Sequence, residues 1–180
     1  DHDCWIFVNA QAFGNSQIFG DSRVFGNSRV YGNSAVYGNS SVSGNSRIFG
    51  NARVSEYHRV QFGTCTTDLS LRENLVESIS AQCNLPVFGN YLYAVKVVNN
   101  DLSSEYDSTF KYKVGEWVEA ENPDLSNRSC ASGLHVSNHN YCPMSGNQKK
   151  IICKVMLDDI ITVQAGKIRC KKLFVGDICL

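Results

Sequence analysis

The first third of the chain repeats apolar and polar positions with a fixed period of six residues. One aliphatic residue returns at every sixth position from Ile6 to Val60, and a small residue, usually Ser, follows most of them four positions later. Gly-Asn or Gly-Asp stands in between, as in the hexad Val24-Phe25-Gly26-Asn27-Ser28-Arg29. A short, fixed period of this kind indicates a solenoid.

Each hexad predicts one flat side of a triangular β-coil with three sides per turn. The aliphatic residue points inward from a short strand, and its two neighbours point outward. Gly-Asn supplies the corner, because both residues tolerate the backbone conformations of tight turns. The pattern resembles the left-handed parallel β-helix of hexapeptide-repeat proteins, and it runs through ten hexads without an insertion.

An aromatic ladder is expected on one outer face of this solenoid. Residues three hexads apart stack on the same face, which aligns Phe13, Tyr31 and Phe49. A row of exposed rings marks a contact surface. Hexapeptide-repeat β-helices form parallel trimers, so the resemblance implies a homotrimer, with these three residues in the interface.

Hexapeptide-repeat proteins include many acyltransferases, which place a catalytic His where a loop leaves the coil. Here no loop interrupts the hexads, and His58 lies at the frayed end of the repeat. We therefore interpret His58 as an end-capping side chain. Five arginines on outward positions favour a solvated face over a phosphate-binding stripe; they are Arg23, Arg29, Arg47, Arg53 and Arg59.

A helical pattern replaces the hexads after Val60. Leu71, Leu75 and Ile79 form an apolar stripe, Ser70 with Glu73 matches a capping box, and Pro86 ends the segment. We expect this helix to cover the open end of the solenoid, as terminal repeats require. The predicted divisions are 1–63 for the β-helix, 64–90 for the capping helix and linker, and 91–180 for a C-terminal domain.

The C-terminal domain is expected to be a compact α+β unit in a mainly β chain. Its strand-like runs, rich in β-branched and aromatic residues, are 91–98, 110–118, 134–136, 151–157, 160–163 and 168–175. The predicted fold is thus a left-handed parallel β-helix, a linking helix and a small α+β domain.

Composition narrows the partners and the cellular compartment that the chain is expected to have. The chain has 17 basic and 17 acidic residues, which makes nucleic acid an improbable partner, and no apolar run approaches the roughly 18 residues of a membrane span. Eight scattered cysteines in apolar or strand-like runs suit buried thiols in a reducing compartment. These features predict a cytoplasmic protein, in the host cell if it is viral, with no membrane contact and no cofactor.

The C-terminal region resembles an uncharacterised domain found behind pentapeptide- or hexapeptide-type repeats in phages and large DNA viruses. The resemblance covers roughly residues 68–180 and implies a viral accessory context without an established chemistry. It departs from the family pattern at residues 140–142, where an aromatic pair is expected. The matching stretches are 71–74, 93–96, 112–115, 127–137, 159–164 and 167–173.

Candidate chemistry concentrates in residues 127–137. Arg128 can hold a phosphate or carboxylate bidentately with help from Asn127 and Ser129, and His135 follows on a short strand. The alternative is structural: Asn127 and Arg128 pin a long loop, and His135 is a partly buried, satisfied side chain. Both interpretations remain open from the sequence.

Three further hypotheses use the same segment. Residues 133–137 faintly resemble a strand of ADP-ribosyltransferases, with His135 in place of a ring-stacking Tyr, but an early His and a late catalytic Glu are missing. Cys130 and His135 are candidates for a nucleophile and its base, against a buried structural thiol. A weak zinc candidate combines Cys130, His135, His139 and Cys142, although the spacing matches no standard finger.

Basic residues alternate with apolar ones near the C-terminus and are expected to form a solvated strand face; they are Lys167, Arg169, Lys171 and Lys172. The sequence as a whole predicts a trimeric viral or phage accessory binding protein. In this reading the β-helix is the assembly scaffold, and the C-terminal domain binds a host protein or a small nucleotide ligand. The alternative is a nucleotide- or NAD-handling enzyme that uses residues 127–137.

Overall fold

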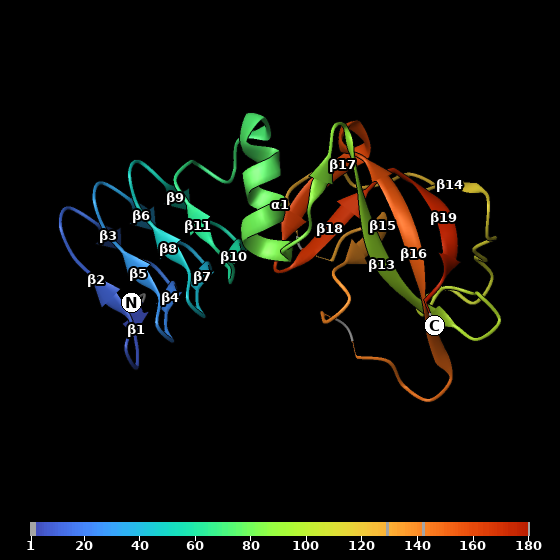
Figure 1. The fold of residues 1–180 in the computed structure, drawn as a ribbon, viewed down its shortest axis with the longest axis horizontal. Coiled ribbons are helices and arrows are strands. Elements are labelled where there is room, and N and C mark those ends of the chain that lie inside the picture. The colour runs from blue at the N-terminus through green and yellow to red at the C-terminus, as the bar shows by residue number, and fades with distance from the viewer. Residues whose placement is uncertain (1–2, 129, 142, 180) are drawn as a thin grey trace. The chain divides into compact units, whose positions relative to one another are not determined.

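The computed structural model describes residues 3–128, 130–141 and 143–179, and the chain divides into two units (Figure 1). The first comprises Asp1–Asn84 with Val163–Ala165, and the second comprises Leu85–Thr162 with Gly166–Leu180. The chain is mainly β, as predicted, with a parallel solenoid followed by an antiparallel sheet. Among the described residues, no helix is long and apolar enough to span a membrane.

The solenoid consists of two-residue strands that pair in parallel with strands one turn away (Figure 1). Each hexad contributes one strand, so every third strand falls in the same sheet. The first sheet contains β1 (Trp5–Ile6), β4 (Arg23–Val24), β7 (Ser41–Val42) and β10 (Arg59–Val60). The second contains β2 (Gln11–Ala12), β5 (Arg29–Val30), β8 (Arg47–Ile48) and β11 (Thr64–Cys65), and the third contains β3 (Gln17–Ile18), β6 (Ala35–Val36) and β9 (Arg53–Val54).

The repeated aliphatic position forms the core of this unit. From Val24 to Val60 each of these side chains is fully buried. The serines at the corners are buried as well, and their hydroxyls bond to the backbone: Ser28 Oγ donates to the carbonyl of Phe25 at 2.8 Å. Ser recurs because a small hydroxyl fits the corner and bonds to a backbone carbonyl there.

Conformation and space both favour glycine at the corners, although Val8 and Glu56 occupy the same position of the hexad with φ +59° and +55°. Gly26 has φ +73°, and a Cβ there would lie 3.1 Å from the backbone nitrogen and oxygen of Gly44 in the next turn. The following asparagines stack one turn apart, and Asn27 Nδ2 donates to Asn45 Oδ1 at 3.3 Å. The corners therefore hold successive turns in register.

The outer faces carry the predicted aromatic ladder. The ring centroids of Phe13 and Tyr31 lie 5.0 Å apart, as do those of Tyr31 and Phe49. A second, shorter ladder pairs Phe19 with Tyr37 at 5.0 Å. The five arginines of the repeat are exposed, whereas His58 is buried, with Nδ1 2.7 Å from the carbonyl oxygen of Ser55.

Helix α1 (Leu75–Cys83) packs on the last turn of the solenoid, after a short 3-10 helix, η1 (Arg72–Asn74). The carbonyl of Ala81 accepts the backbone N–H groups of Gln61 and Phe62. The expected capping box is wrong: Ser70 Oγ donates to Asp68 Oδ1 at 2.6 Å, and α1 begins only at Leu75 without a side-chain cap. Asp68 therefore draws Ser70 into a local turn instead of the helix.

The second unit is built on an antiparallel sheet with the order β14-β19-β16-β13-β15-β18-β17, to which β12 adds by pairing with β13. A 3-10 helix, η2 (Leu157–Asp159), connects β16 to β17. The strands are β12 (Val87–Phe88), β13 (Tyr91–Asn99), β14 (Trp117–Glu119), β15 (Leu134–Ser137), β16 (Gln148–Met156), β17 (Ile160–Gln164), β18 (Lys167–Cys170) and β19 (Lys172–Ile178).

Two strand predictions need correction. The expected strand over 110–118 is reduced to β14, because the chain turns at Gly115 with φ +85°. The run 168–175 divides into β18 and β19 on either side of Lys171. The prediction of a solvated basic face is also wrong for Arg169, which is only 2% exposed.

Candidate functional site

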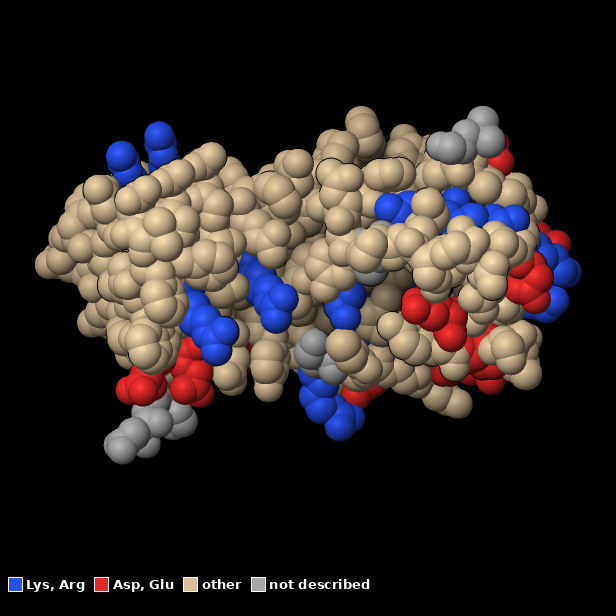
Figure 2. All heavy atoms as spheres, turned by 90° about the horizontal axis from the view of Figure 1, so that it is seen from below, with Lys and Arg blue, Asp and Glu red and all other residues tan. Residues whose placement is uncertain are grey.

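An open cavity of about 810 Å³ lies in the second unit, over β13 and β15. Its walls come from β13 residues 95–97, the segment 104–112, residues 130–133 just before β15, and Lys167 of β18. In Figure 2 the surface of this unit is hollowed, and blue basic and red acidic side chains lie beside the hollow. The cavity thus gathers segments that are far apart in the sequence onto one sheet.

His135 lies in the part of the cavity formed by β15. Its partner in the antiparallel register is Arg169 of β18, and Lys167 stands two residues from Arg169 on the same face of that strand. Lys96 of β13 approaches from the other side, and its Nζ donates to the carbonyl of His135 at 3.2 Å. His135 therefore lies among three cationic side chains.

The surroundings of His135 favour its neutral form. Burial, followed by the charges of Lys96, Lys167 and Arg169, lowers the pKa of His135 from 6.5 to about 4. At neutral pH the ring is uncharged, with one nitrogen that donates and one that accepts hydrogen bonds. The local potential is positive although the imidazole itself is not.

An aromatic wall faces these polar groups. Tyr112 is buried, which raises its pKa, and its ring contacts Phe110 edge-on at 5.2 Å between centroids. Lys96 Nζ lies 5.3 Å from the centroid of Tyr112. Tyr106 contributes a ring that is 93% exposed. The wall offers apolar surface for a ligand next to charged groups.

Acidic side chains also line the cavity, but all of them are exposed; they are Glu105, Asp107 and Glu121. The Asp107 carboxylate accepts bonds from Oγ1 and the backbone N–H of Thr109 at 2.6 and 2.9 Å. These bonds lower the pKa of Asp107. The acids therefore lie in loops at the solvent, whereas Lys96 and Lys167 are half-buried on strands.

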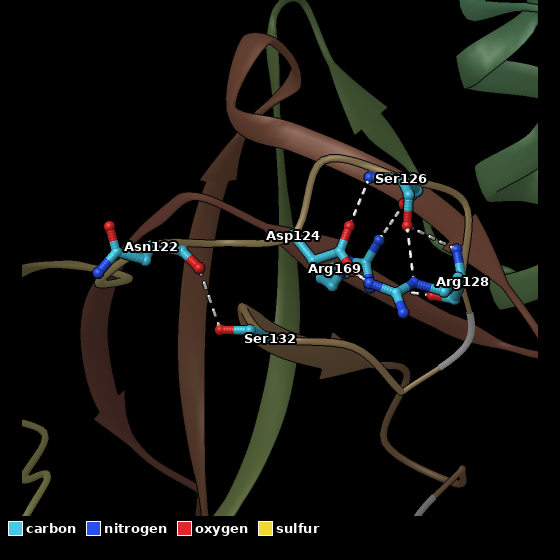
Figure 3. Close-up of polar contacts among 6 residues, drawn as sticks. All are labelled: Asn122, Asp124, Ser126, Arg128, Ser132 and Arg169. Carbon is cyan, nitrogen blue, oxygen red and sulfur yellow. Dashed lines mark hydrogen bonds and ion pairs between the residues drawn. The ribbon is translucent and has the colours of Figure 1, made fainter.

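The loop before β15 is held by a buried arginine (Figure 3). Arg169 Nη1 donates to the carbonyl of Arg128 at 2.9 Å, and Nη2 donates to the carbonyl of Ser126. Its Nε has no hydrogen-bond partner among the described residues. Close packing continues at Gly133, where φ is +143° and a Cβ would lie 2.9 Å from Cγ of Arg169.

A second network stabilises the outer part of this loop (Figure 3). Arg128 Nη2 lies 2.5 Å from Asp124 Oδ2, and the backbone N–H of Ser126 donates to Asp124 Oδ1 at 2.8 Å. Hydrogen bonds from Ser126, with a smaller contribution from Arg128, lower the pKa of Asp124 to about 2. The loop is also tied to its base, since Asp124 N donates to the carbonyl of Ser132 at 3.0 Å.

The structure separates the residues that the sequence grouped. Cys130 and His135 line the cavity, whereas the Arg128 side chain is 79% exposed, pairs with Asp124 and does not line it. Asn127 lies exposed in the same loop. Ser129 and Cys142 lie outside the described residues. The geometry of Arg128 matches the loop-pinning interpretation of the sequence.

Cys130 is exposed and has φ +57°. Lys167 Nζ lies 3.1 Å from its Sγ, and an ammonium at this distance favours a thiolate. His139 is exposed, and its carbonyl accepts a bond from Lys150. Among the described residues, no cluster of three or more His, Cys, Asp or Glu side chains is arranged to hold a metal.

Three residues of the cavity were not predicted as site residues: Lys96, Lys167 and Tyr112. Lys96 carries a recognisable signal, because it is the only charged residue in the apolar run of β13. A lone cation on a half-buried strand needs a compensating partner or a ligand. Lys167 and Tyr112 give no local signal, since their role depends on which strands become neighbours.

Residues 92–177 match the model of a family described as a domain of unknown function (DUF7666). The matched range includes the cavity residues and the arginine-held loop. It confirms the expectation of an uncharacterised domain in the C-terminal part of the chain. No curated protein and no solved structure matches the chain.

Proposed function

We propose that the protein is a binding protein in which the solenoid assembles copies of the chain and the C-terminal unit binds a small ligand. The cavity over β13 and β15 carries this proposal. It combines polar groups from several strands with an aromatic wall, which is the usual composition of a ligand site. Assembly would bring several such sites together and raise avidity without new contacts.

The assembly part rests on the ladder of Phe13, Tyr31 and Phe49. These rings are stacked along one face, and Phe13 is 49% exposed. A continuous row of rings is a more favourable contact than scattered exposed residues. We propose a left-handed hexapeptide-type solenoid that forms a homotrimer through this face.

The cellular context is part of the proposal. All described cysteines are free, and four of them are buried: Cys65, Cys83, Cys153 and Cys170. Free buried thiols suit a reducing compartment. We place the protein in the cytoplasm, of an infected host if the chain is viral, as the resemblance of its C-terminal region to phage and viral domains suggests. A host protein is the other partner class compatible with such a context.

Sedimentation analysis tests the assembly. Phe13→Glu with Tyr31→Glu is expected to convert a trimer to a monomer, because charged side chains would lie in an apolar contact. Phe19→Glu with Tyr37→Glu is the matched control, since this pair occupies equivalent hexad positions on the other ladder. A monomeric wild type, or equal effects of the two pairs, would refute the proposed interface.

The ligand part is tested by a thermal-shift screen of phosphate, nucleotides, NAD, ADP-ribose and carboxylic acids. A ligand at 100 times its dissociation constant stabilises the native state by about 2.7 kcal/mol. NMR signals of His135 then locate the ligand. If no compound stabilises the protein or changes these signals, a protein partner replaces the small ligand in the proposal.

A second candidate is an enzyme that acts on a nucleotide or NAD. The observation that favours it is that Cys130 and His135 line the same cavity. Cys130 would act as the nucleophile, and the neutral His135 would act as a base. Turnover of a nucleotide that Cys130→Ser abolishes without loss of binding would support this candidate.

A further inference from the structure

The charged side chains that act on His135 are all cationic. Lys167 and Arg169 approach from β18 and Lys96 from β13, and all three charges lower the pKa of His135. No carboxylate among the described residues contributes to the pKa shift of His135. Cys130 is the other ionisable group of the surroundings, beside Lys167.

Cys130 compensates part of the charge at Lys167, whose pKa is raised although burial opposes this. At His135, by contrast, the positive charges dominate. Like charges near each other in a half-buried position repel, and the neighbouring imidazole gives up its own proton. Arg169 has a structural role, because its guanidinium holds the carbonyls of Ser126 and Arg128. Holding the loop does not explain why Lys96 and Lys167 are directed to the same cavity. Strongly perturbed ionisable groups in a cleft favour a functional site.

The acidic side chains of the cavity do not compensate these cations. Glu105, Asp107 and Glu121 are exposed, so solvent screens their charges. Asp107 is also engaged by Thr109. The positive potential is therefore concentrated at the strands, where a ligand that enters the cavity would be desolvated.

We propose that the cavity selects an anionic ligand and binds its phosphate or carboxylate group at His135, between Lys96 and Lys167. This inference rests on the proposed ligand-binding function and specifies the ligand class. The two ammonium groups supply charge-assisted hydrogen bonds. The ring of His135 already bonds to the backbone of Gly133, so it becomes a further donor for the anion only when it takes up a proton. At about 810 Å³ the cavity exceeds the size of a free phosphate ion. The remaining space along Tyr112 and Phe110 fits an organic group, such as a ring.

Binding of an anion at this position is coupled to a proton. The anion offsets the charges of Lys96, Lys167 and Arg169. The pKa of His135 is therefore higher in the complex than in the free protein, where it is about 4. The complex takes up a proton at a pH where the free protein does not. Affinity for the anion therefore increases as the pH falls from 7 towards 5.

NMR titration of the 180-residue chain with labelled histidines tests this inference, with inorganic phosphate, AMP, citrate and the uncharged adenosine as probes. Phosphate, AMP or citrate is expected to shift the ring signals of His135 and to raise its titration midpoint. Phosphate and citrate separate the two anion chemistries, and AMP against phosphate measures the contribution of the ring wall. Adenosine is expected to bind at least about ten-fold more weakly than AMP, because it lacks the charge-assisted bonds.

Lys96→Met and Lys167→Met keep side-chain length and remove one charge each. Each substitution is expected to weaken binding of the anion by about ten-fold or more. Lys113→Met is the matched control, because the Lys113 side chain is 72% exposed and does not line the cavity. Far-ultraviolet circular dichroism checks that the variants fold.

Two results would overturn the inference, and they differ in what they say about the proposed function. If adenosine shifts His135 as strongly as AMP and the lysine variants bind normally, the cavity binds ligands but does not select anions. If none of the four probes affects His135, the anion site is wrong and the ligand-binding function loses its support as well.

Discussion

Gly133→Ala is the substitution that most directly tests how the loop before β15 is held. The added Cβ would lie 2.9 Å from Cγ and 3.1 Å from Cδ of Arg169, and the backbone at Gly133 has φ +143°. Arg169 cannot move away freely, because it is buried and its guanidinium holds the carbonyls of Ser126 and Arg128. The new methyl group therefore competes with the bonds that hold the loop.

The expected cost follows from two contributions. Backbone strain at an unfavourable φ costs about 1–3 kcal/mol, and each lost bond from a charged donor costs about 1.5–3 kcal/mol. We expect the free energy of unfolding to fall by about 3 kcal/mol or more if Arg169 is displaced. Urea denaturation measures this loss, and trypsin cleavage after the exposed Arg128 reports whether the loop is released.

Gly115→Ala is the matched control. Gly115 also has positive φ, at +85°, but a Cβ there would have no atom within 4 Å. This variant should lose only the strain contribution, about 1–3 kcal/mol, and cleavage after Arg128 should stay at the wild-type rate. The reasoning is refuted if Gly133→Ala is as stable as Gly115→Ala and its loop is no more sensitive to trypsin.

Three further outcomes are expected. Gly26→Ala should destabilise the solenoid more than Gly63→Ala in thermal unfolding, because both have positive φ but only the first Cβ meets backbone, that of Gly44 at 3.1 Å; equal losses would contradict the argument from space. Iodoacetamide at pH 7.5 should label Cys130 within minutes, and Lys167→Met should slow this reaction. Mass spectrometry should find slow labelling at buried thiols whose pKa is raised by burial, namely Cys65, Cys83, Cys153 and Cys170. His135→Gln should reduce the loss of stability between pH 6.5 and 4, because the depressed pKa makes the folded state bind fewer protons than the unfolded state in this range; urea midpoints that fall equally in both proteins would disprove it.

The solenoid was predictable because its information is local. Each hexad specifies an inward aliphatic residue, a corner and a small buried residue, as in residues 24–29, and no distant partner is needed to read it. The prediction fails first where the pattern ends. Thr64 pairs with Arg47, a separation one residue shorter than in the regular turns, and Ser70 bonds to Asp68 instead of capping a helix.

The cavity was not predictable in the same way, because its residues meet only through the order of strands. Lys96 reaches the carbonyl of His135 across 39 residues, and Lys167 reaches Cys130 across 37. The sequence located His135 and Cys130 by their chemistry, but it left open whether Arg128 binds a ligand or pins the loop. Asp124 lies four residues before Arg128, and this short separation allows an ion pair that needs no ligand.

The stacking of the corner asparagines has a consequence for how the repeat can change in length. The side chain of Asn9 donates a hydrogen bond to Asn27, and Asn27 donates one to Asn45, each across a separation of 18 residues. Gain or loss of 18 residues preserves every outer column, including the aromatic one. Gain or loss of a single hexad leaves the aliphatic interior intact but moves each later side chain to the neighbouring face. Duplication and deletion can therefore alter the outer surface of the solenoid in discrete steps without disturbing its core.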